Sequence, residues 1–453
     1  MPSRRDFAKT LTAGVAVASL ARSASAQTSP SDTVNLAVVG FRGRGRDHYR
    51  TFARIPGVRI AYLCDVDERL FGRGVSEVEE IAGYRPQTET DIRRLLERQD
   101  LDAITVATPD HWHALMTVWG CQAGKDVYVE KPCSYTLWEG RKMVEAARKY
   151  NRIVQVGLNR RSENPNRSLM PFLHAGNFGT PYRAKAIVYR GRASIGRMQE
   201  SSIPQGVNWD LYLGPAPYRA FTLNRFHYGW HFFWDTSTTE IGNNGVHYLD
   251  LIRWGMQQNT HPVKIHCTGG QFAESDSEVP DVQFGSFEYA DGRIVEVDST
   301  TLYSPPFGGL RMGAFMYTDQ GYISQEGNWK LVQGKFTVRD SEDPSGVSLR
   351  ASNLSFPRIE YLDGPAIPQT AEPEVSHFQN FIDCVRSRER DNLNCEVEQG
   401  HLSTSLCHLA NISFRTGRKL VFDPKTETFP GDDEANALLR REYREPYVLP
   451  DQV

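Results

Sequence analysis

Two patterns of hydrophobic and polar positions divide the chain. Between residues 31 and 159, short unbroken apolar runs rich in β-branched residues alternate with charged, amphipathic segments. Unbroken runs are typical of strands buried on both faces, and their alternation with helices predicts a doubly wound parallel sheet of the Rossmann type. The predicted strands lie in VNLAVVG (34–40), RIAYLCD (59–65), DAITVATP (102–109), DVYVEKP (126–132) and RIVQVGL (152–158).

From residue 160 onward, apolar and polar residues alternate along longer strands, which is typical of an antiparallel sheet with one buried face. Helical spacing returns in 378–385 and 402–409. We therefore predict an α+β substrate domain over 160–420, with a large, open, mostly antiparallel sheet and a surface-wrapping tail over 421–453. The predicted strands lie in 182–190, 263–272, 282–289, 293–302 and 313–323, with a hairpin turn at 290–292.

The first 26 residues have the pattern of an export signal. Arg4 and Arg5 precede an uncharged apolar stretch over 11–21, and small residues follow at 24–26. Eleven residues at ~1.5 Å each cannot cross a ~30 Å bilayer core. The paired arginines resemble a twin-arginine signal, which the twin-arginine machinery reads on folded proteins. This predicts cleavage before Gln27 and a periplasmic location; the alternative is a disordered basic N-terminus.

Composition excludes several classes of function. Removal of residues 1–26 takes away four basic residues and one acidic residue, so the formal charge falls from −3 to −6. An acidic surface argues against nucleic-acid binding and against a polybasic membrane anchor. No later segment approaches eighteen apolar residues, and the seven cysteines form no C-x-x-C pair. We expect no membrane span, no disulfide framework and no metal site.

The turn after the first predicted strand, GFRGRGRD, is a partial dinucleotide fingerprint. Gly40 and Gly45 occupy the first and third glycine positions, whereas Arg42 stands at the second, with Gly43 beside it. The Arg42 side chain would have to swing away from the phosphates. Asp65 ends the next strand, where a carboxylate accepts ribose hydroxyls and repels a 2′-phosphate, which favours NAD over NADP. The alternative is a glycine-rich turn without a ligand.

Three further motifs follow in order: ATPDHWHALM (107–116), GKDVYVEKP (124–132) and EIGNNGVHYLDLIRW (240–254). Together with the glycine turn, they resemble the Gfo/Idh/MocA family, which includes glucose–fructose oxidoreductase and inositol dehydrogenase. The resemblance covers nearly the whole chain after residue 26, and the Glu-Lys-Pro triplet is its most specific part. The C-terminal region resembles a secreted bacterial branch of that family.

The resemblance implies roles for the matching residues. Lys131 would contact the substrate hydroxyl, and His247 would be the acid/base histidine that takes its proton. Asn243 stands where the family usually has Asp, and it cannot take a proton, so more of the chemistry falls on Lys131 and His247. The expected cofactor-binding residues are Gly40, Phe41, Arg42, Gly43, Arg44, Gly45, Asp65, Thr108, Pro109, His113, Glu130, Lys131 and Asn159.

Aromatic and basic residues near these motifs suggest a carbohydrate site. Flat aromatic rings and fork-shaped guanidinium donors suit a sugar or an acidic sugar. An alternative for each tryptophan is a place in the core. The expected substrate-binding residues are Arg160, Arg161, Trp230, Trp234 and His247.

An exported NAD enzyme must carry its cofactor through the membrane and restore it in each cycle. We therefore expect a periplasmic oxidoreductase that acts on a secondary hydroxyl of a sugar, with a tightly bound, internally recycled NAD. One alternative is a glycoside hydrolase, lyase or epimerase that works by transient oxidation, elimination and re-reduction. The other is a nucleotide-binding sensor without turnover. A homo-oligomer formed through the open sheet is also expected.

Overall fold

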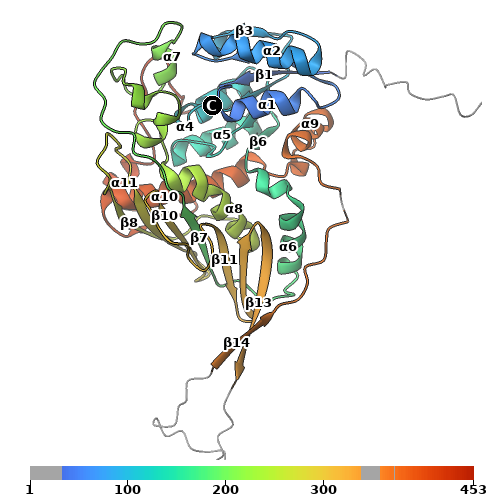
Figure 1. The fold of residues 1–453 in the computed structure, drawn as a ribbon, viewed down its shortest axis with the longest axis vertical. Helices are drawn as coiled ribbons and strands as arrows, with labels where there is room; N and C mark the ends of the chain where they lie inside the picture. The colour runs from blue at the N-terminus through green and yellow to red at the C-terminus, as the bar shows by residue number, and fades with distance from the viewer. Residues whose placement is uncertain (1–32, 338–357, 372) are drawn as a thin grey trace, which may run out of the picture.

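The computed structural model describes residues 33–337, 358–371 and 373–453 (Figure 1). The predicted export signal at 1–26 lies outside these residues. A six-stranded sheet and a nine-stranded sheet form the two halves of the molecule. Within the described residues, no helix combines the length and the apolar character that crossing a membrane requires.

The N-terminal half is a parallel sheet with the strand order β3-β2-β1-β4-β5-β6, as in a Rossmann fold. The five predicted strands are present, and the short β3 is an additional one. The strands are β1 (Val34–Val39), β2 (Val58–Cys64), β3 (Gln87–Glu89), β4 (Ala103–Val106), β5 (Asp126–Val129) and β6 (Val154–Val156). The helices are α1 (Arg44–Phe52), α2 (Phe71–Ala82), α3 (Ile92–Leu96), α4 (Asp110–Gln122) and α5 (Leu137–Lys149).

Helix α5 begins with a capping box. The Thr136 hydroxyl accepts a hydrogen bond from the Glu139 amide, and the Glu139 carboxylate accepts one from the Thr136 amide. This reciprocal capping box satisfies two amides that a helix start otherwise leaves unpaired.

The C-terminal half is a mixed, mostly antiparallel sheet with the order β14-β13-β12-β11-β7-β10-β9-β8-β15. The β7–β10 pair is parallel, and the predicted hairpin joins β9 to β10. The strands are β7 (Arg183–Tyr189), β8 (Lys264–Gly270), β9 (Val282–Glu288), β10 (Ile294–Thr300), β11 (Met312–Thr318), β12 (Gly321–Glu326), β13 (Asn328–Thr337), β14 (Arg358–Asp363) and β15 (Leu420–Val421).

The prediction of one strand over 313–323 is wrong. This segment contains most of β11, a turn at 319–320 and the start of β12, which pairs back on β11. Gly321 has a φ of +151° at this turn, a conformation that side chains disfavour. The apolar alternation continues through the turn, so the pattern alone does not reveal the reversal.

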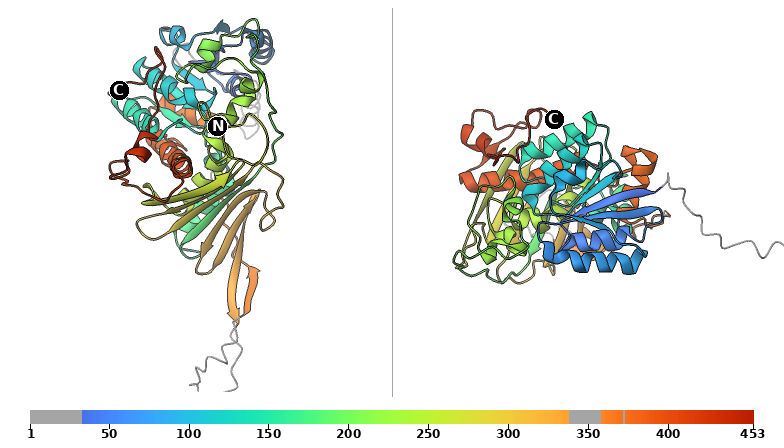
Figure 2. Two further views of the ribbon diagram at one scale, coloured as in Figure 1. Left: turned by 90° about the vertical axis from the view of Figure 1, so that its left-hand side faces the viewer. Right: turned by 90° about the horizontal axis from the view of Figure 1, so that it is seen from above.

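Helices cover one face of the large sheet, between it and the nucleotide-binding half (Figures 1 and 2). They are α6 (Asn164–His174), α8 (Val246–Gly255) and α10 (Val397–Thr416). Helix α10 ends where Gly417 adopts a left-handed conformation, which glycine tolerates better than any residue with a side chain. Helix α9 (His377–Ser387) follows the large sheet in sequence, yet Phe378 and Phe381 pack in the core of the nucleotide-binding half.

A long connection over residues 191–235, here called the strap, crosses from the large sheet to the nucleotide-binding half. It contains α7 (Trp209–Leu213). The Glu68 amide donates to the Gly206 carbonyl at 2.8 Å, and the Asn208 amide donates to the Val66 carbonyl at 2.8 Å. The strap therefore lies across the carboxyl end of β2, where a Rossmann fold binds the adenosine part of its cofactor.

The C-terminal tail contributes to the core as well as covering the surface. Tyr447 and Leu449 are fully buried, and the short helix α11 (Asp433–Ala437) lies against α10. Tyr447 packs at 5.4 Å from the Trp112 ring of α4, and its hydroxyl donates to Asp210 of the strap at 2.8 Å. The tail thus fastens the strap to α4.

Candidate active site

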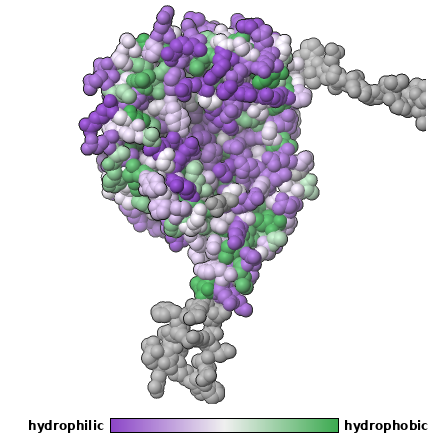
Figure 3. Space-filling model, viewed as in Figure 1, coloured by the Kyte–Doolittle hydropathy of each residue, from purple (hydrophilic) through white to green (hydrophobic). Residues whose placement is uncertain are grey.

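A cavity of about 500 Å³ lies at the carboxyl ends of the parallel strands, beneath the strap. This volume is typical of a small-molecule site, and this edge of a parallel sheet is where such sites lie. The surface seen in the direction of Figure 3 is largely hydrophilic around this region. The predicted residues that line the cavity are Gly40, Arg42, Gly43, Arg44, Asp65, Thr108, Pro109, His113, Glu130, Lys131, Asn159, Trp230, Asn243 and His247.

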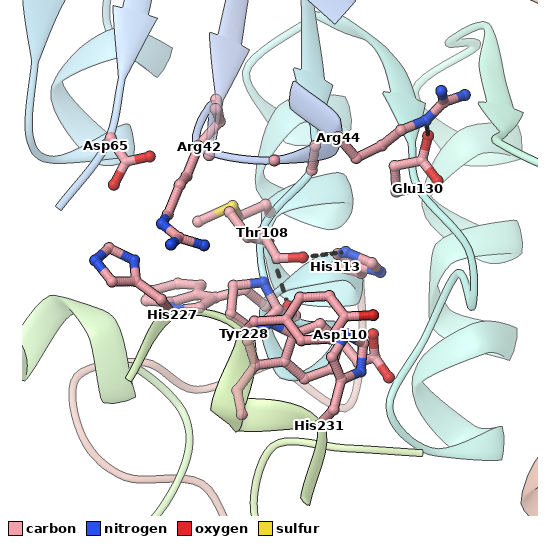
Figure 4. A pocket seen from close by; sticks show the side chains of 18 of the residues that line it. Arg42, Arg44, Asp65, Thr108, Asp110, His113, Glu130, His227, Tyr228 and His231 are labelled. Atoms are coloured by element: carbon pink, nitrogen blue, oxygen red, sulfur yellow. Dashed lines mark hydrogen bonds and ion pairs between the residues drawn. The ribbon is translucent and has the colours of Figure 1, made fainter. Parts of the chain in front are cut away.

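The glycine turn brings backbone close to backbone at the cavity edge. Gly40 has a φ of +76°, and a side chain there would meet the Ala107 carbonyl and the Thr108 amide at 2.9 Å. A Cβ on Gly45 would lie 1.9 Å from the Gly40 carbonyl oxygen. Both glycines are therefore required by the turn itself, as the fingerprint predicts. Arg42 reaches down from the turn into the cavity, toward His227 (Figure 4).

Asp65 lies at the end of β2 on the cavity wall. Its carboxylate accepts hydrogen bonds from the Phe41 amide at 2.9 Å and the Asp67 amide at 3.1 Å. Burial raises the pKa of Asp65 to about 6, although these amide hydrogen bonds favour its ionised form. The carboxylate is thus oriented by the backbone at the place where the ribose of a dinucleotide lies.

Glu130 ties the glycine turn to the end of β5. Its Oε1 atom accepts from Arg44 Nε at 2.9 Å and lies 3.0 Å from His48 Nε2. Although burial alone would raise the pKa of Glu130, the hydrogen bond with His48 and the charge of Arg44 hold it well below its usual value. The ion pair fixes the backbone on which Lys131 sits.

Lys131, Asn243 and His247 meet on the substrate side of the cavity. Lys131 Nζ donates to the Asn243 backbone oxygen at 2.7 Å and to Asn243 Oδ1 at 3.1 Å. Asn243 lies in a π-helical turn, Ile241–Gly245, directly before α8. Because an ammonium group only donates, the Asn243 amide must present its oxygen to Lys131.

His247 is neutral in this setting. Burial, followed by the positive charge of Lys131, holds the pKa of His247 well below its usual value. Its Nδ1 atom and Asn243 Nδ2 are both buried without a hydrogen-bond partner in the described part of the chain. Two unpaired polar atoms at one wall indicate that a ligand completes their hydrogen bonding.

His113 joins two of the motifs. Its Nδ1 atom lies 2.7 Å from the Pro132 carbonyl oxygen, and its Nε2 atom lies 2.9 Å from the Thr108 carbonyl oxygen (Figure 4). The ring therefore holds the ends of β4 and β5 at a set separation while one edge lines the cavity.

Three of the predicted residues lie behind or beside the cavity lining. The Phe41 ring stacks on Phe71 in the core, so only its backbone faces Asp65. Gly45 is buried under the turn. Arg160 lies at the rim, with its guanidinium over the Tyr248 ring at 4.7 Å.

The placement of Arg161 and Trp234 in the substrate site is wrong. Arg161 is buried away from the cavity and makes a bidentate ion pair with Asp250, at 2.8 Å between its Nη2 atom and Asp250 Oδ1. Trp234 packs against Phe414 in a separate hollow. A buried arginine finds a carboxylate wherever the fold supplies one, and sequence spacing does not show which.

Several lining residues were not among the predicted site residues. Asp110, within the ATPDHWHALM motif, accepts from the Thr238 hydroxyl at 2.6 Å, and burial raises its pKa to about 7. Strap residues form much of the remaining wall, and their aromatic clustering is the signal in the sequence. The additional polar and aromatic lining residues are Thr90, Asp110, Trp112, Arg190, Tyr212, His227, Tyr228, His231 and Asn244.

Away from the cavity, His261, His401 and Glu427 have the geometry of a metal-ligand group. Glu427 Oε1 lies 2.7 Å from His261 Nε2 and 2.9 Å from His401 Nε2, and it also accepts from Arg141 Nη2 at 2.6 Å. The Arg141 guanidinium donates to both oxygens of the Glu427 carboxylate, so these contacts form a hydrogen-bond network that joins the tail to α5 and α10.

Comparison with known families identifies this architecture. The family described as "Oxidoreductase family, NAD-binding Rossmann fold" matches residues 34–158. The "Oxidoreductase family, C-terminal alpha/beta domain" matches residues 182–303 and 294–449. The chain belongs to the Gfo/Idh/MocA oxidoreductase family.

Relatives within and around this family have carbohydrate-related names. A glycosyl hydrolase family 109 protein of Shewanella sp. is 30% identical over 167 residues, 32% of this chain and 36% of the relative. Inositol 2-dehydrogenase 1 of Saccharopolyspora erythraea is 26% identical over 268 residues, 59% of this chain and 67% of the relative. The chain thus spans about a third of the first relative's length.

Solved structures show the same fold at low sequence identity. The WlbA dehydrogenase of Bordetella pertussis, solved with NADH and UDP-GlcNAcA, has a TM-score of 0.59 and 18% identity, covering 86% of this chain and 99% of that one. As a Gfo/Idh/MocA protein, this chain has a cavity whose residues fit a dinucleotide: the close-packed Gly40–Gly45 turn and Asp65, at the end of β2, lie where a Rossmann fold binds the pyrophosphate and the ribose.

Proposed function

We propose that this protein oxidises a secondary hydroxyl of a sugar or sugar derivative with NAD that is tightly bound and recycled within the site. The observation that carries the proposal is the meeting of Lys131, Asn243 and His247 on one side of the cavity, opposite the glycine turn. When bound, NAD⁺ would accept a hydride from the carbinol carbon, and the NADH formed would pass that hydride to a second, oxidised sugar, so that one sugar is oxidised as the other is reduced.

The chain's own residues handle the proton. The Lys131 ammonium group, which donates to Asn243 Oδ1, would also donate a hydrogen bond to the substrate oxygen. Neutral His247 can accept the proton of the substrate hydroxyl. Asn243 orients Lys131 without supplying a negative charge. Asp110 lines the same cavity, where its carboxylate accepts hydrogen bonds from the Thr238 amide and hydroxyl.

The strap supports retention of the cofactor. It crosses β2 with two backbone hydrogen bonds and brings His227 to 3.2 Å from Asp67. A dinucleotide beneath it could leave only after these contacts break. The carboxylate of Asp65 also favours NAD over NADP, because a 2′-phosphate would meet a like charge there.

The direct test is to denature the purified protein and assay the supernatant for nicotinamide dinucleotide by mass spectrometry. NAD or NADH that survives prior dialysis is the expected result. Absorbance at 340 nm should then rise when sugars are added to the intact protein. The proposal would be excluded if the purified protein held no dinucleotide and if no sugar reduced NAD⁺ that was added to it.

Glycoside cleavage by transient oxidation is the second candidate, favoured by the similarity to the Shewanella glycosyl hydrolase family 109 protein. Oxidation of a hydroxyl to a ketone acidifies the neighbouring C–H, which permits elimination of a glycosidic substituent. Incubation with glycosides in heavy water separates the two. Released aglycone with deuterium beside the transient ketone identifies cleavage, whereas an oxidised sugar without deuterium identifies the oxidoreductase.

We further propose export in the folded state by the twin-arginine route to the periplasm. The pair Arg4-Arg5 and the small residues before Gln27 support this proposal. Replacement of both arginines with lysine should retain the precursor in the cytoplasm, as measured by cell fractionation. Unimpaired export of that variant would contradict the route.

We propose that the protein forms a homo-oligomer through the open sheet, because the outer face of this sheet exposes apolar side chains. Phe284 and Ile294 are 48% and 39% exposed there, beside a small cluster of Ile187, Leu310 and Phe315. In the described part of the chain the helices lie against the opposite face. A second copy of the sheet would remove this apolar surface from water.

A further inference from the structure

The substrate end of the cavity carries an arginine that the proposed hydride chemistry does not use. Arg190 follows β7 and lines the cavity on the same side as Lys131. Its recorded hydrogen bond is from Nη1 to Asn244 Oδ1 at 3.2 Å, and among the described residues no carboxylate lies within ion-pair distance of it. An exposed guanidinium that faces a cavity without a carboxylate partner is suited to an anionic ligand.

Buried polar contacts hold Arg190 in this position. Asn244 Nδ2 donates to the Glu240 carboxylate, which also pairs with Arg192 Nε at 2.7 Å. Because a carboxylate only accepts, the Asn244 amide must direct its nitrogen toward Glu240 and its oxygen toward Arg190. The Arg192–Glu240–Asn244 chain therefore orients Arg190, while Arg192 itself is neutralised by Glu240.

The carboxylates that line the same cavity do not offset this charge. Asp65 lies at the opposite, ribose end, and Glu130 is paired with Arg44 and His48. Asp110 is buried against Thr238 near Lys131. The substrate end thus holds two cations, Lys131 and Arg190, with neutral asparagines as their recorded hydrogen-bond partners.

Both cations are held by the same short turn. Asn243 and Asn244 are consecutive residues of one π-helical turn, and each holds one cation by its side-chain oxygen. We infer that the substrate is a saccharide that carries an oxyanion as well as the reacting hydroxyl. Lys131 would hold the hydroxyl, and the Arg190 guanidinium would bind the oxyanion through two parallel hydrogen bonds.

This inference rests on the proposed function, and the experiments below distinguish a failure of the inference from a failure of that function. Reduction of the bound cofactor at 340 nm is measured with methyl glucuronide and methyl glucoside, which differ only in the carboxylate. Glucose 6-sulfate and glucose 6-phosphate are further arms. We expect an anionic sugar to have the higher kcat/KM, and the preferred arm identifies the oxyanion as carboxylate, sulfate or phosphate.

Arg190→Gln is the test variant, and Arg183→Gln, at the first residue of β7, is its matched control. Arg183 is exposed and pairs with Glu296 outside the cavity. Loss of a charge-assisted pair should raise KM for the anionic sugar about 10- to 100-fold in Arg190→Gln, with a smaller effect on kcat. Arg183→Gln should leave KM at the parent value.

Equilibrium binding by calorimetry distinguishes the two possible failures. Anionic sugars that bind more tightly than neutral ones, and lose this advantage in Arg190→Gln, support the inference even if no sugar reduces the cofactor. Equal binding and turnover of neutral and anionic sugars, or an anionic preference that survives in Arg190→Gln, would overturn it while leaving the oxidoreductase proposal intact.

Discussion

At the scale of single residues, the site combines groups whose charges are set by their neighbours. Lys131 is held by an amide where the family resemblance leads one to expect a carboxylate, so its positive charge has no fixed counter-ion at Asn243. The same positive charge, together with burial, keeps His247 neutral. Lys131 and His247 can therefore handle the substrate proton because they lie close together in the cavity, and they need no carboxylate as an ion-pair partner.

Replacement of Lys131 or His247 with Ala should abolish reduction of bound NAD by substrate. A lost proton-transfer group typically costs ~10²–10⁴-fold in rate. The measurement is single-turnover absorbance at 340 nm, and the cofactor content of each variant should match that of the parent. Lys330→Ala, at an exposed lysine on β13, is the control. Parent-like rates in both variants would show that other groups handle the proton.

Asp65→Ala should weaken cofactor retention and relax the selection against NADP. The carboxylate accepts two backbone amides and is the negative charge expected to repel a 2′-phosphate. NAD content after dialysis should fall, while the circular dichroism spectrum stays that of the parent. If NAD content remains unchanged in the variant, Asp65 does not bind the ribose.

At the scale of elements, the strap and the tail act together over the cavity. Trp112 of α4 donates to the Leu211 carbonyl of the strap at 3.1 Å, and Tyr447 of the tail packs on the other side of Trp112. Arg444 donates to the Gly214 carbonyl at 3.0 Å. The last residues of the chain thus determine how firmly the roof of the site is held.

Tyr447→Ala should therefore release the cofactor faster. Removal of a buried aromatic ring costs ~3–5 kcal/mol in the free energy of unfolding, and here the loss falls on the contact between tail and strap. NAD remaining after timed dialysis measures the effect. Tyr218→Ala, which removes a 66% exposed ring from the same strap, should retain NAD like the parent. If both variants retain NAD equally, the tail does not help to hold the cofactor.

The outer face of the large sheet makes a separate prediction. Phe284→Glu places a charge on β9, within the face proposed to bind a second copy, so the oligomer should dissociate. Light scattering after size-exclusion chromatography measures the mass. A monomeric parent, or a variant with the parent's mass, would contradict the interface.

At the scale of the whole molecule, the distribution of buried ionisable groups predicts how stability depends on pH. Burial lowers the pKa of several histidines to about 3 or 4, so below about pH 6.5 the unfolded chain binds protons that the folded chain does not. Asp65 and Asp110, with pKa values raised to about 6 and 7, act in the opposite direction. The histidines concerned are His111, His227, His377, His401 and His408.

The pKa of Glu139 and of Glu163 is also raised by burial. Because the histidines of lowered pKa still outnumber these carboxyl groups, the protein should lose stability as the pH falls from about 6.5 toward 4. The thermal unfolding midpoint, measured by calorimetry at intervals between pH 7.5 and 4.5, should decline over this range. A midpoint that rises on acidification would mean that the raised carboxyl groups dominate.

Hydrophobic patterning was enough to predict most of the elements and most of the cofactor side of the site, although it merged β11 with the start of β12. An unbroken apolar run is typical of a strand buried on both faces, and an alternating run is typical of a strand buried on one face. Five parallel strands and the hairpin of the large sheet could therefore be predicted. The glycine turn, Asp65 and the Glu-Lys-Pro triplet follow directly on those strands. Local order therefore places them at one edge of the sheet.

Only the tertiary structure decided which distant residues complete the site. Arg160 and Arg161 are neighbours in sequence, yet one lies at the rim and the other is buried against Asp250. Arg190 acquires its role from Asn244, 54 residues away. Such pairings depend on how the two halves pack, because charge neutralisation and burial are properties of the three-dimensional neighbourhood and leave no periodic signal in the chain.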